Sequence, residues 1–519
     1  MNNYKNIVNI INFLRGMGSQ TDNIDLLEPI TENIKLLKEL NIKSTFLVQY
    51  DVMDSEDMVN ALKGAGDLFE IGGWLEIVEP LATSAGENWR GRQHWDYHAN
   101  VDFPIGYTPD VRRKIVDRFM ERFYEVFGKY PKSMGAWLID SITLDYLKEK
   151  YNIEAACICR DQYGTDGYNF WGGYYSHGYY PSKKNMLCPA QTKEQQIELP
   201  VFRMLGSDPI HQYDSGLIGE DGKIKPSAWQ KVITMEPAYP LYGGNPEWSD
   251  WFFRNNYSGN NLGFAYTQIG QENSFGWPRV EKGLRAQYAM VQKMADEGKV
   301  FVESLSESGK WFKSKFEFSP TCSLPFGDDW SNKKAQSFWY YSRFYRTDIY
   351  IENRKFWIRD LHIFDENYAE RYFEDIERSS CSLYDTLPVM DGYRFSKEDF
   401  RAGGYFKTLN GEEIDVNSVS AVKNYEKSEQ EIHVSTDKGD FDILCSEKAL
   451  CISAKGTDYT LTFSGVSEFI SPEIVDKKTL AFMHNGFNYT LHIKDGSLSV
   501  NGGEPCVNSE NGKISFMFG

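Results

Sequence analysis

The stretch Gly128-Lys-Tyr-Pro-Lys-Ser-Met-Gly-Ala-Trp137 decides the fold. It follows a run with helical periodicity over residues 111–127 and enters an apolar strand that ends at Asp140. A helix that leads through a turn into a buried strand is a repeating unit of α/β folds. We therefore expect this stretch to belong to a sheet whose strands are separated by helices.

Two further phrases lie upstream, Asn41-Ile-Lys-Ser-Thr-Phe-Leu-Val48 and Glu70-Ile-Gly-Gly-Trp74. Together with 128–137 they resemble three consecutive landmarks of the polysaccharide deacetylase family, a branch of the glycoside hydrolase/deacetylase superfamily. That family shows "gly-ile-lys-ala-thr-phe-phe", then "glu-ile-gly", then "gly-x-x-pro" before a substrate-lining strand. The similarity extends over roughly residues 5–310. The resemblance implies a (β/α)7–8 barrel of the glycoside hydrolase/deacetylase type and a carbohydrate substrate.

The metal-binding residues of the family are not retained. Its members hold a divalent metal with an Asp pair that closes the first strand and with two His spaced four apart after "glu-ile-gly". Here the first strand, residues 7–15, contains no acid, and Trp74 and Val78 occupy the two His positions. Neither side chain can ligate a metal. We expect the scaffold of the superfamily with different chemistry, and no metal or other cofactor.

The alternation of segments predicts two domains. Apolar strand-like runs alternate with helix-period segments through the first 310 residues, which indicates a parallel sheet closed into a barrel over residues 1–325. From about Ser331 the pattern changes to short alternating strands with turns such as Asn410-Gly411 and Lys494-Asp-Gly496. We expect an all-β sandwich domain over residues 326–519.

Composition excludes several classes of partner. The net charge of −18 argues against nucleic acid and anionic membrane, because both require clustered Lys and Arg. No run of 18 apolar residues occurs, and the N-terminus lacks the pattern of a signal peptide, which predicts a cytoplasmic protein. The eight scattered cysteines are expected to be reduced core thiols. The sequence leaves open whether the protein forms a homo-oligomer.

Aromatic residues make up 15% of the chain and crowd the segments 89–95, 163–180 and 239–257 together with Gly, Asn, Asp and Arg. Loops of this kind stack on sugar rings, which offer apolar C–H patches and a hydroxyl rim. The alternative is that these loops are packed by their own side chains. Among the aromatics we expect Trp74, Trp95, Trp137 and Trp277 to bind substrate.

Carboxylates dominate the ends of the predicted barrel strands, where α/β barrels place their working groups. Glu272 is the strongest catalytic candidate, because it follows the apolar strand 263–271 and precedes an aromatic loop. Carboxylates that converge among aromatics are the minimum equipment for glycoside hydrolysis. The alternative is an acid that favours the positive end of the following helix. The strand ends read, in order, Arg15, Gln49, Asp51, Trp74, Glu76, Trp137, Asp140, Arg160, Asp161, Asp208, Gln271 and Glu272.

Asp140, Asp161 and Asp208 are the expected partners of Glu272. Asp140 closes the fourth strand, although Asp140-Ser-Ile-Thr also has the pattern of a helix N-cap. Asp208 and Glu236 also follow apolar strands. Either of them could replace Asp140 in the catalytic pair. Further side chains are expected to bind the sugar rather than to react: Glu76, His94, His98, Arg160, Asp166 and Glu236.

His94-Trp-Asp-Tyr-His98 supports a different chemistry. A His-x-x-x-His spacing on a helix would place both rings on one face, as a metal site requires. However, the segment contains Gly91, Pro104 and Gly106, which indicate a loop. The sequence therefore favours a metal-independent glycoside hydrolase acting on an oligosaccharide through paired carboxylates. The alternatives are a metal-dependent carbohydrate deacetylase and a non-catalytic carbohydrate-binding protein.

Overall fold

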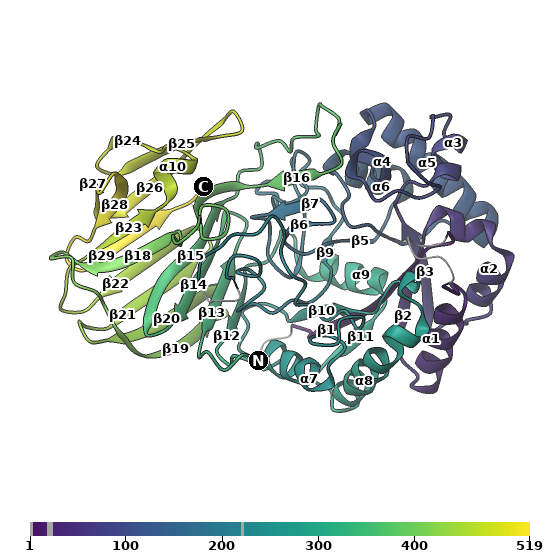
Figure 1. Ribbon diagram of the computed structural model, residues 1–519, viewed down its shortest axis with the longest axis horizontal. Helices are drawn as coiled ribbons and strands as arrows, with labels where there is room; N and C mark the ends of the chain where they lie inside the picture. Colours follow the sequence, from purple (N-terminus) through teal and green to yellow (C-terminus); the bar gives the residue numbers. More distant parts are fainter. Residues whose placement is uncertain (1–3, 18–23, 220–222) are drawn as a thin grey trace.

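The computed structural model describes residues 4–17, 24–219 and 223–519. The N-terminal half is a nearly closed mixed barrel of strands surrounded by helices (Figure 1). The strand order is β10-β1-β2-β3-β4-β5-β9-β8, with β11 beside β1, and only β8 runs antiparallel to its neighbour. The barrel strands are β1 (Ile7–Leu14), β2 (Ser44–Val48), β3 (Phe69–Trp74), β4 (Ser133–Gly135), β5 (Ala155–Ile158), β8 (Gly178–Tyr179), β9 (Val201–Arg203), β10 (Tyr266–Ile269) and β11 (Phe301–Glu303). The predicted barrel is confirmed.

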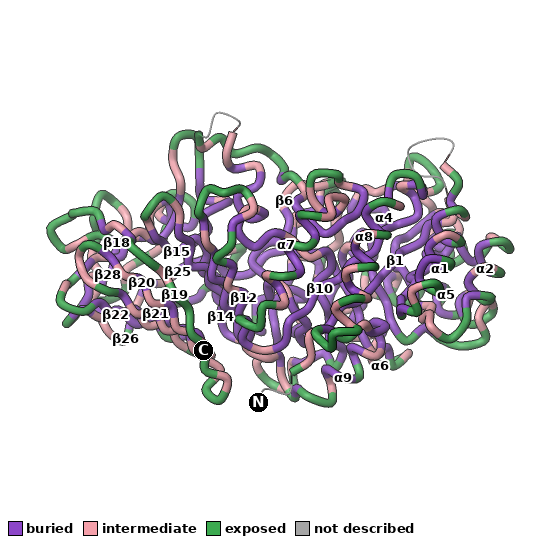
Figure 2. Tube along the Cα trace, turned by 90° about the horizontal axis from the view of Figure 1, so that it is seen from below, coloured by how far each residue is buried: buried purple, intermediate pink, exposed green. Residues whose placement is uncertain are grey.

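The helices pack on the outside of the barrel through apolar stripes. In α1 the buried residues Ile30, Ile34 and Leu37 recur at helical spacing, which turns one face of the helix toward the sheet. β1 is buried along its whole length and pairs with strands on both of its edges, and Figure 2 shows the trace near β1 and β10 mostly as buried. The longer helices are α1 (Glu28–Glu39), α2 (Glu56–Lys63), α5 (Pro109–Phe127), α6 (Ser141–Tyr151), α7 (Pro246–Asn256), α8 (Trp277–Asp296) and α9 (Leu305–Lys315). Of the helices in the described residues, none is both long and apolar enough to cross a bilayer.

A side chain bridges the barrel where two strands fail to pair. No ladder joins β9 with β10 in the described chain. Instead, the backbone N–H of Leu205, just after β9, donates to Oε1 of Gln268 on β10 at 2.8 Å. Phe202 and Tyr266 pack across the same gap with ring centroids 5.1 Å apart. The barrel therefore stays nearly closed without a complete ring of strands.

The C-terminal half consists of antiparallel sheets, as predicted (Figure 1). Every second residue of β20 is buried, the period expected of a sheet with one face on a core. Phe356, Phe441 and Tyr459 pack between the two sheets. One sheet contains β12 (Cys322–Phe326), β13 (Gln336–Tyr341), β14 (Tyr345–Glu352), β15 (Lys355–Ile363), β17 (Leu387–Asp391), β18 (Gly403–Thr408), β23 (Tyr459–Ser464), β27 (Ser497–Asn501) and β28 (Glu504–Asn508). The other contains β19 (Val416–Asn424), β20 (Glu429–Thr436), β21 (Phe441–Ser446), β22 (Ala449–Ala454), β24 (Glu473–Asp476), β25 (Thr479–His484), β26 (Phe487–Asp495) and β29 (Lys513–Met517).

The two halves interlock. The border expected after residue 325 falls inside β12, which pairs with β13 of the C-terminal sheet. β16 (Ser382–Asp385) returns to the barrel and pairs with β7 (Tyr168–Trp171), which also pairs with β6 (Gln162–Thr165). Asp161 of the barrel accepts hydrogen bonds from Arg203, at 2.6 Å, and from Arg346 of β14. The same Arg346 is paired with Asp360 at 2.8 Å, so a buried ionic network joins the halves.

We predict that Asp161→Asn destabilises the protein, because it leaves two buried guanidinium groups short of negative charge. The expected loss in the free energy of unfolding is about 3–5 kcal/mol, measured by urea titration. Asp110→Asn is the control, since Asp110 forms an exposed pair with Arg113 and should cost at most about 1 kcal/mol. A catalytic role for Asp161 requires the opposite result, namely normal stability with lost turnover.

Candidate functional site

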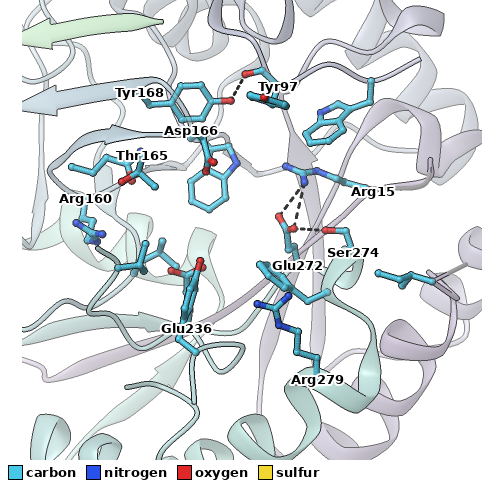
Figure 3. A pocket seen from close by; sticks show the side chains of 18 residues that line it. Arg15, Tyr97, Arg160, Thr165, Asp166, Tyr168, Glu236, Glu272, Ser274 and Arg279 are labelled. Atoms are coloured by element: carbon cyan, nitrogen blue, oxygen red, sulfur yellow. Dashed lines mark hydrogen bonds and ion pairs between the residues drawn. The ribbon is translucent and has the colours of Figure 1, made fainter. Parts of the chain in front are cut away.

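A cavity of about 310 Å³ opens at the carboxyl ends of the barrel strands. Its lining residues follow separate strands: Arg15 follows β1, Trp137 follows β4, Arg160 follows β5 and Glu272 follows β10. Parallel strands bring such residues to one rim although they are distant in the sequence. Loops complete the wall, and Figure 3 shows these side chains around the cavity. The further lining residues, from loops, from β6 and β7 and from the short helix Asn273–Phe275, include Trp95, Tyr97, Gln162, Thr165, Asp166, Tyr168, Glu236, Tyr239, Ser274 and Phe275.

Arg15 is the buried cation of the site. Its Nη2 lies 2.9 Å from Oε1 of Glu76, and its Nε donates to Oε2 of the same carboxylate at 3.1 Å. Gln49 also donates to Glu76, at 3.0 Å. The Arg15 guanidinium stacks on Trp95 at 4.3 Å. Burial alone would lower the pKa of Arg15, but the carboxylates of Glu272 and Glu76 raise it, so the group stays charged.

Glu272 is held beside this cation. Its Oε2 lies 3.2 Å from Nη1 of Arg15, and its Oε1 accepts a hydrogen bond from the hydroxyl of Ser274 (Figure 3). Although Glu272 precedes the short helix Asn273–Phe275, its side chain makes no capping bond to the backbone. The alternative of a helix-entry acid therefore does not describe this geometry. Its carboxylate is directed to the cavity and to Arg15.

Glu236 lies on another wall of the same cavity in a different environment (Figure 3). It is 6% exposed and accepts one hydrogen bond, from the hydroxyl of Thr234 at 2.8 Å. Burial raises the pKa of Glu236 to about 7; Glu272 adds to this effect, whereas Thr234 and Arg160 oppose it. The two glutamates thus lie in different electrostatic environments, because Glu272 pairs with a buried cation whereas Glu236 forms no ion pair with the described residues.

Asp166 and the aromatic loops close the cavity. Asp166 occupies the turn between β6 and β7 with φ 54°, and burial together with Glu272 raises its pKa. The phenol of Tyr168 donates to the carbonyl of Tyr97 at 2.5 Å, which fixes two aromatic loops against each other. Trp95 and Trp137 line the cavity as well. Of the residues that we expected to bind substrate, Trp95, Trp137, Arg160, Asp166 and Glu236 are brought together.

The three aspartates expected to pair with Glu272 do not line this cavity. Asp140 caps α6 by accepting from the N–H of Thr143 at 3.1 Å, and it pairs with Arg112 at 3.0 Å. Asp161 belongs to the ionic network described above. Asp208 accepts from the backbone N–H of Ile210 at 2.8 Å and of His211 at 3.1 Å. In each case backbone N–H groups or buried arginines already satisfy the carboxylate. The second carboxyl group of the cavity, which we expected from one of these aspartates, is that of Glu236.

Other expected substrate-binding residues lie outside the cavity lining. Trp74 is fully buried, stacked on Phe13 at 4.2 Å and in edge contact with Trp137, so it supports the cavity from behind. Glu76 lies behind Arg15, and Trp277 begins α8 as a buried residue. His94 is exposed and contacts Glu79, whereas His98 lies 3.1 Å from Asp96.

The residues at the family's metal position do not fit a metal ion. Trp74 and Val78 are buried and offer no ligand atoms, and the neighbouring carboxylates Glu76 and Glu272 hold the guanidinium of Arg15. His94 and His98 contact separate carboxylates. Among the described residues, a group of ligands close enough to share an ion occurs in the C-terminal sheet, far from the cavity: Glu431, His433 and Asp442.

Several lining residues had no assigned role in the sequence. Arg15 was on the list of strand ends, but its charge gave no indication of its partners. Tyr168 and Tyr239 belong to the aromatic segments that indicated sugar-binding loops, which was the available signal. The sequence contained no signal for Ser274 and Arg279, because both lie beyond the strand end, Ser274 in the short helix Asn273–Phe275 and Arg279 in α8.

The comparisons with known proteins concern the fold. Residues 97–287 match the family model DUF3863, described as a domain of unknown function with a solved structure. A sequence search of curated proteins found no match. Among solved structures, a candidate glycoside hydrolase/deacetylase from Parabacteroides distasonis is similar with a TM-score of 0.53 and 15% identity, over 74% of this chain and 91% of that one.

Two further solved structures are similar with lower TM-scores. A candidate polysaccharide deacetylase from Mycobacterium smegmatis has a TM-score of 0.35 and 13% identity, over 60% of this chain and 92% of that one. Another such structure, from Pseudomonas aeruginosa PAO1, has a TM-score of 0.36 and 12% identity, over 60% and 93%. The barrel and the sheets that follow it are thus structurally similar to the glycoside hydrolase/deacetylase family, with a DUF3863 region at residues 97–287.

Proposed function

We propose that the protein is a metal-independent glycoside hydrolase that cleaves an oligosaccharide, with Glu236 as general acid and Glu272 as its carboxylate partner. The observation that carries the proposal is that both glutamates line one cavity in different environments: Glu272 is paired with Arg15, whereas burial raises the pKa of Glu236 to about 7. Pairs of carboxyl groups separated in this way are the equipment of acid and base catalysis on a glycosidic bond.

In the proposed reaction Glu236 donates its proton to the glycosidic oxygen as the bond from that oxygen to the anomeric carbon breaks. Glu272 supplies negative charge to the anomeric carbon, as a nucleophile or as the base for a water molecule. The contacts with Arg15 and Ser274 fix the orientation of Glu272. If Glu272 is the nucleophile, water then displaces it from the anomeric carbon and gives its proton to Glu236, which restores both groups. If Glu272 is the base, it takes the proton of the attacking water, and exchange with solvent then returns a proton to Glu236 and removes the one from Glu272.

The rest of the cavity supports a sugar as the substrate. Trp95, Trp137 and Tyr239 offer aromatic faces, and Gln162 and Thr165 offer hydrogen-bonding groups beside them. A pyranose requires this combination of apolar faces and a polar rim. The volume lies at the small end of ligand pockets, which suits a short part of a sugar chain.

Deacetylation is less well supported. In the family that the chain resembles, that reaction needs a metal, and the positions of the metal ligands carry Trp74 and Val78. The similar solved structure is named for both glycoside hydrolysis and deacetylation, so the fold does not distinguish these activities and the residues of the site must. The site favours acid and base catalysis by two glutamates.

We predict that Glu236→Gln and Glu272→Gln each lower kcat on a natural glycoside by about 10² or more, with the fold intact. Glu247→Gln, an exposed change in α7, is the control and should leave kcat unaltered. The two roles separate on an aryl glycoside with an acidic phenol as leaving group, which needs no proton. Glu236→Gln should recover most of its turnover on that substrate, and Glu272→Gln should not. Recovery by both variants, or by neither, contradicts the assignment.

The pH dependence offers an independent test. Because Glu236 must be protonated to act, kcat/KM of the wild type should fall as the pH rises through about 7. On the aryl glycoside the Glu236→Gln variant should lack this alkaline decline. A decline that is the same in both proteins would show that another group controls it.

Glu236 should also make stability depend on pH. Its pKa rises from 4.5 in the unfolded chain to about 7 in the folded protein, so the folded state loses stability as the pH rises from about 4.5 through 7. Glu236→Gln removes this loss and should be more stable than the wild type at pH 8, by up to about 3 kcal/mol. Urea titrations at pH 5 and pH 8 measure the change, and a difference that is independent of pH would contradict the predicted ionisation.

A further inference from the structure

Arg160 is a buried cation without a negative partner. Six arginines are buried in the described chain, and five of them form ion pairs with carboxylates: Arg15, Arg112, Arg203, Arg346 and Arg359. Arg160 forms none with the described residues, although it is only 4% exposed. Burying an unpaired charge is costly, so this exception calls for a partner from outside the chain.

The guanidinium of Arg160 is also short of acceptors. An arginine has five N–H donors, and here Nη1 donates to the carbonyl of Asp161 while Nε is buried without an acceptor. Burial lowers the pKa of Arg160, which reflects the same lack of compensation. Glu236 is the nearby carboxyl of the cavity, but it forms no ion pair with Arg160, and burial raises its pKa to about 7, which weakens it as a counter-ion.

Arg160 faces the catalytic cavity, on the side away from Arg15 (Figure 3). The two sides differ in charge. On one side Arg15 is compensated by Glu76 and Glu272, whereas on the other Arg160 is uncompensated. An anionic group entering the cavity is therefore repelled near Glu272 and attracted near Arg160, which defines one orientation for a charged substrate.

Arg279 adds a second unpaired cation to the same cavity. It is exposed, lies over the ring of Phe275 at 4.5 Å and forms no ion pair with the described residues. It occupies the first turn of α8, where a positive charge opposes the helix dipole. Helix stability therefore does not explain an arginine at this position. The net charge of −18 does not explain it either.

We propose that the substrate is an acidic oligosaccharide, in which the carboxylate of a uronic or sialic acid type of sugar binds Arg160, with Arg279 at the mouth of the cavity. This inference rests on the proposed function in that it places the acidic sugar beside Glu236 and Glu272. Guanidinium groups bind carboxylates through short, charge-assisted hydrogen bonds. A sulfate ester presents similar chemistry, so the experiment separates the two anions.

The test is a binding titration with three matched oligosaccharides: one with a uronate, one with that carboxylate reduced to a primary alcohol, and one neutral chain with a sulfate ester. Wild-type protein should bind the uronate about tenfold or more tightly than the reduced analogue. Arg160→Gln should remove this preference while it retains affinity for the reduced analogue, and Arg160→Lys should keep part of it. Arg254→Gln, an exposed change in α7, is the control and should leave the ratio unaltered.

Equal affinity of the wild type for the charged and reduced chains would overturn the inference, and this comparison needs no variant. An undiminished preference in Arg160→Gln would overturn it too, and tighter binding of the sulfated chain would assign the site to sulfate instead. The experiment can reject the acidic-sugar site and the hydrolase activity independently of each other. A uronate preference without bond cleavage leaves the acidic-sugar site standing and rejects the hydrolase, whereas cleavage without any preference does the reverse.

Discussion

The guanidinium of Arg15 is the interaction on which the site depends. It joins the ends of three strands, because Arg15 follows β1, Glu76 follows β3 and Glu272 follows β10. The charge is buried, held through two nitrogens by Glu76 and stacked on Trp95. In the family that the chain resembles, a metal supplies positive charge at these strand ends. Here a side chain that cannot exchange with solvent supplies it, and the carboxylates around it are fixed accordingly.

The surrounding acids follow from that charge. Glu272 contacts the remaining nitrogen of Arg15, whereas Glu236 forms no ion pair among the described residues. Asp102 lies near the same pair, fully buried, and burial together with Glu76 raises its pKa far above the usual range. A neutral Asp102 leaves Arg15 shared between Glu76 and Glu272. Two carboxyl groups, those of Glu76 and Glu272, thus share the buried cation.

The sequence predicted the barrel and the β-rich C-terminal half because both have local signals, namely hydrophobic periodicity and turn residues. It also pointed to Glu272, because barrels of this kind place their working groups at the carboxyl ends of the strands. It could not distinguish Asp140 and Asp208 from catalytic acids, because a strand end is also a helix beginning, where Asp serves as a cap. The role of Asp161 depends on Arg346, which is 185 residues away. Glu236 lies in a long irregular segment after β9, where no periodicity fixes its direction.

The most direct test of the central claim is the mass of the products formed from an acetylated oligosaccharide in ¹⁸O-labelled water, after exhaustive treatment with a chelator. Cleavage by Glu236 and Glu272 predicts shorter chains with one ¹⁸O at each new reducing end, and no such products from Glu272→Gln. Chains of unchanged length that have lost acetyl groups, with activity abolished by the chelator, would contradict the account and establish a metal-dependent deacetylase.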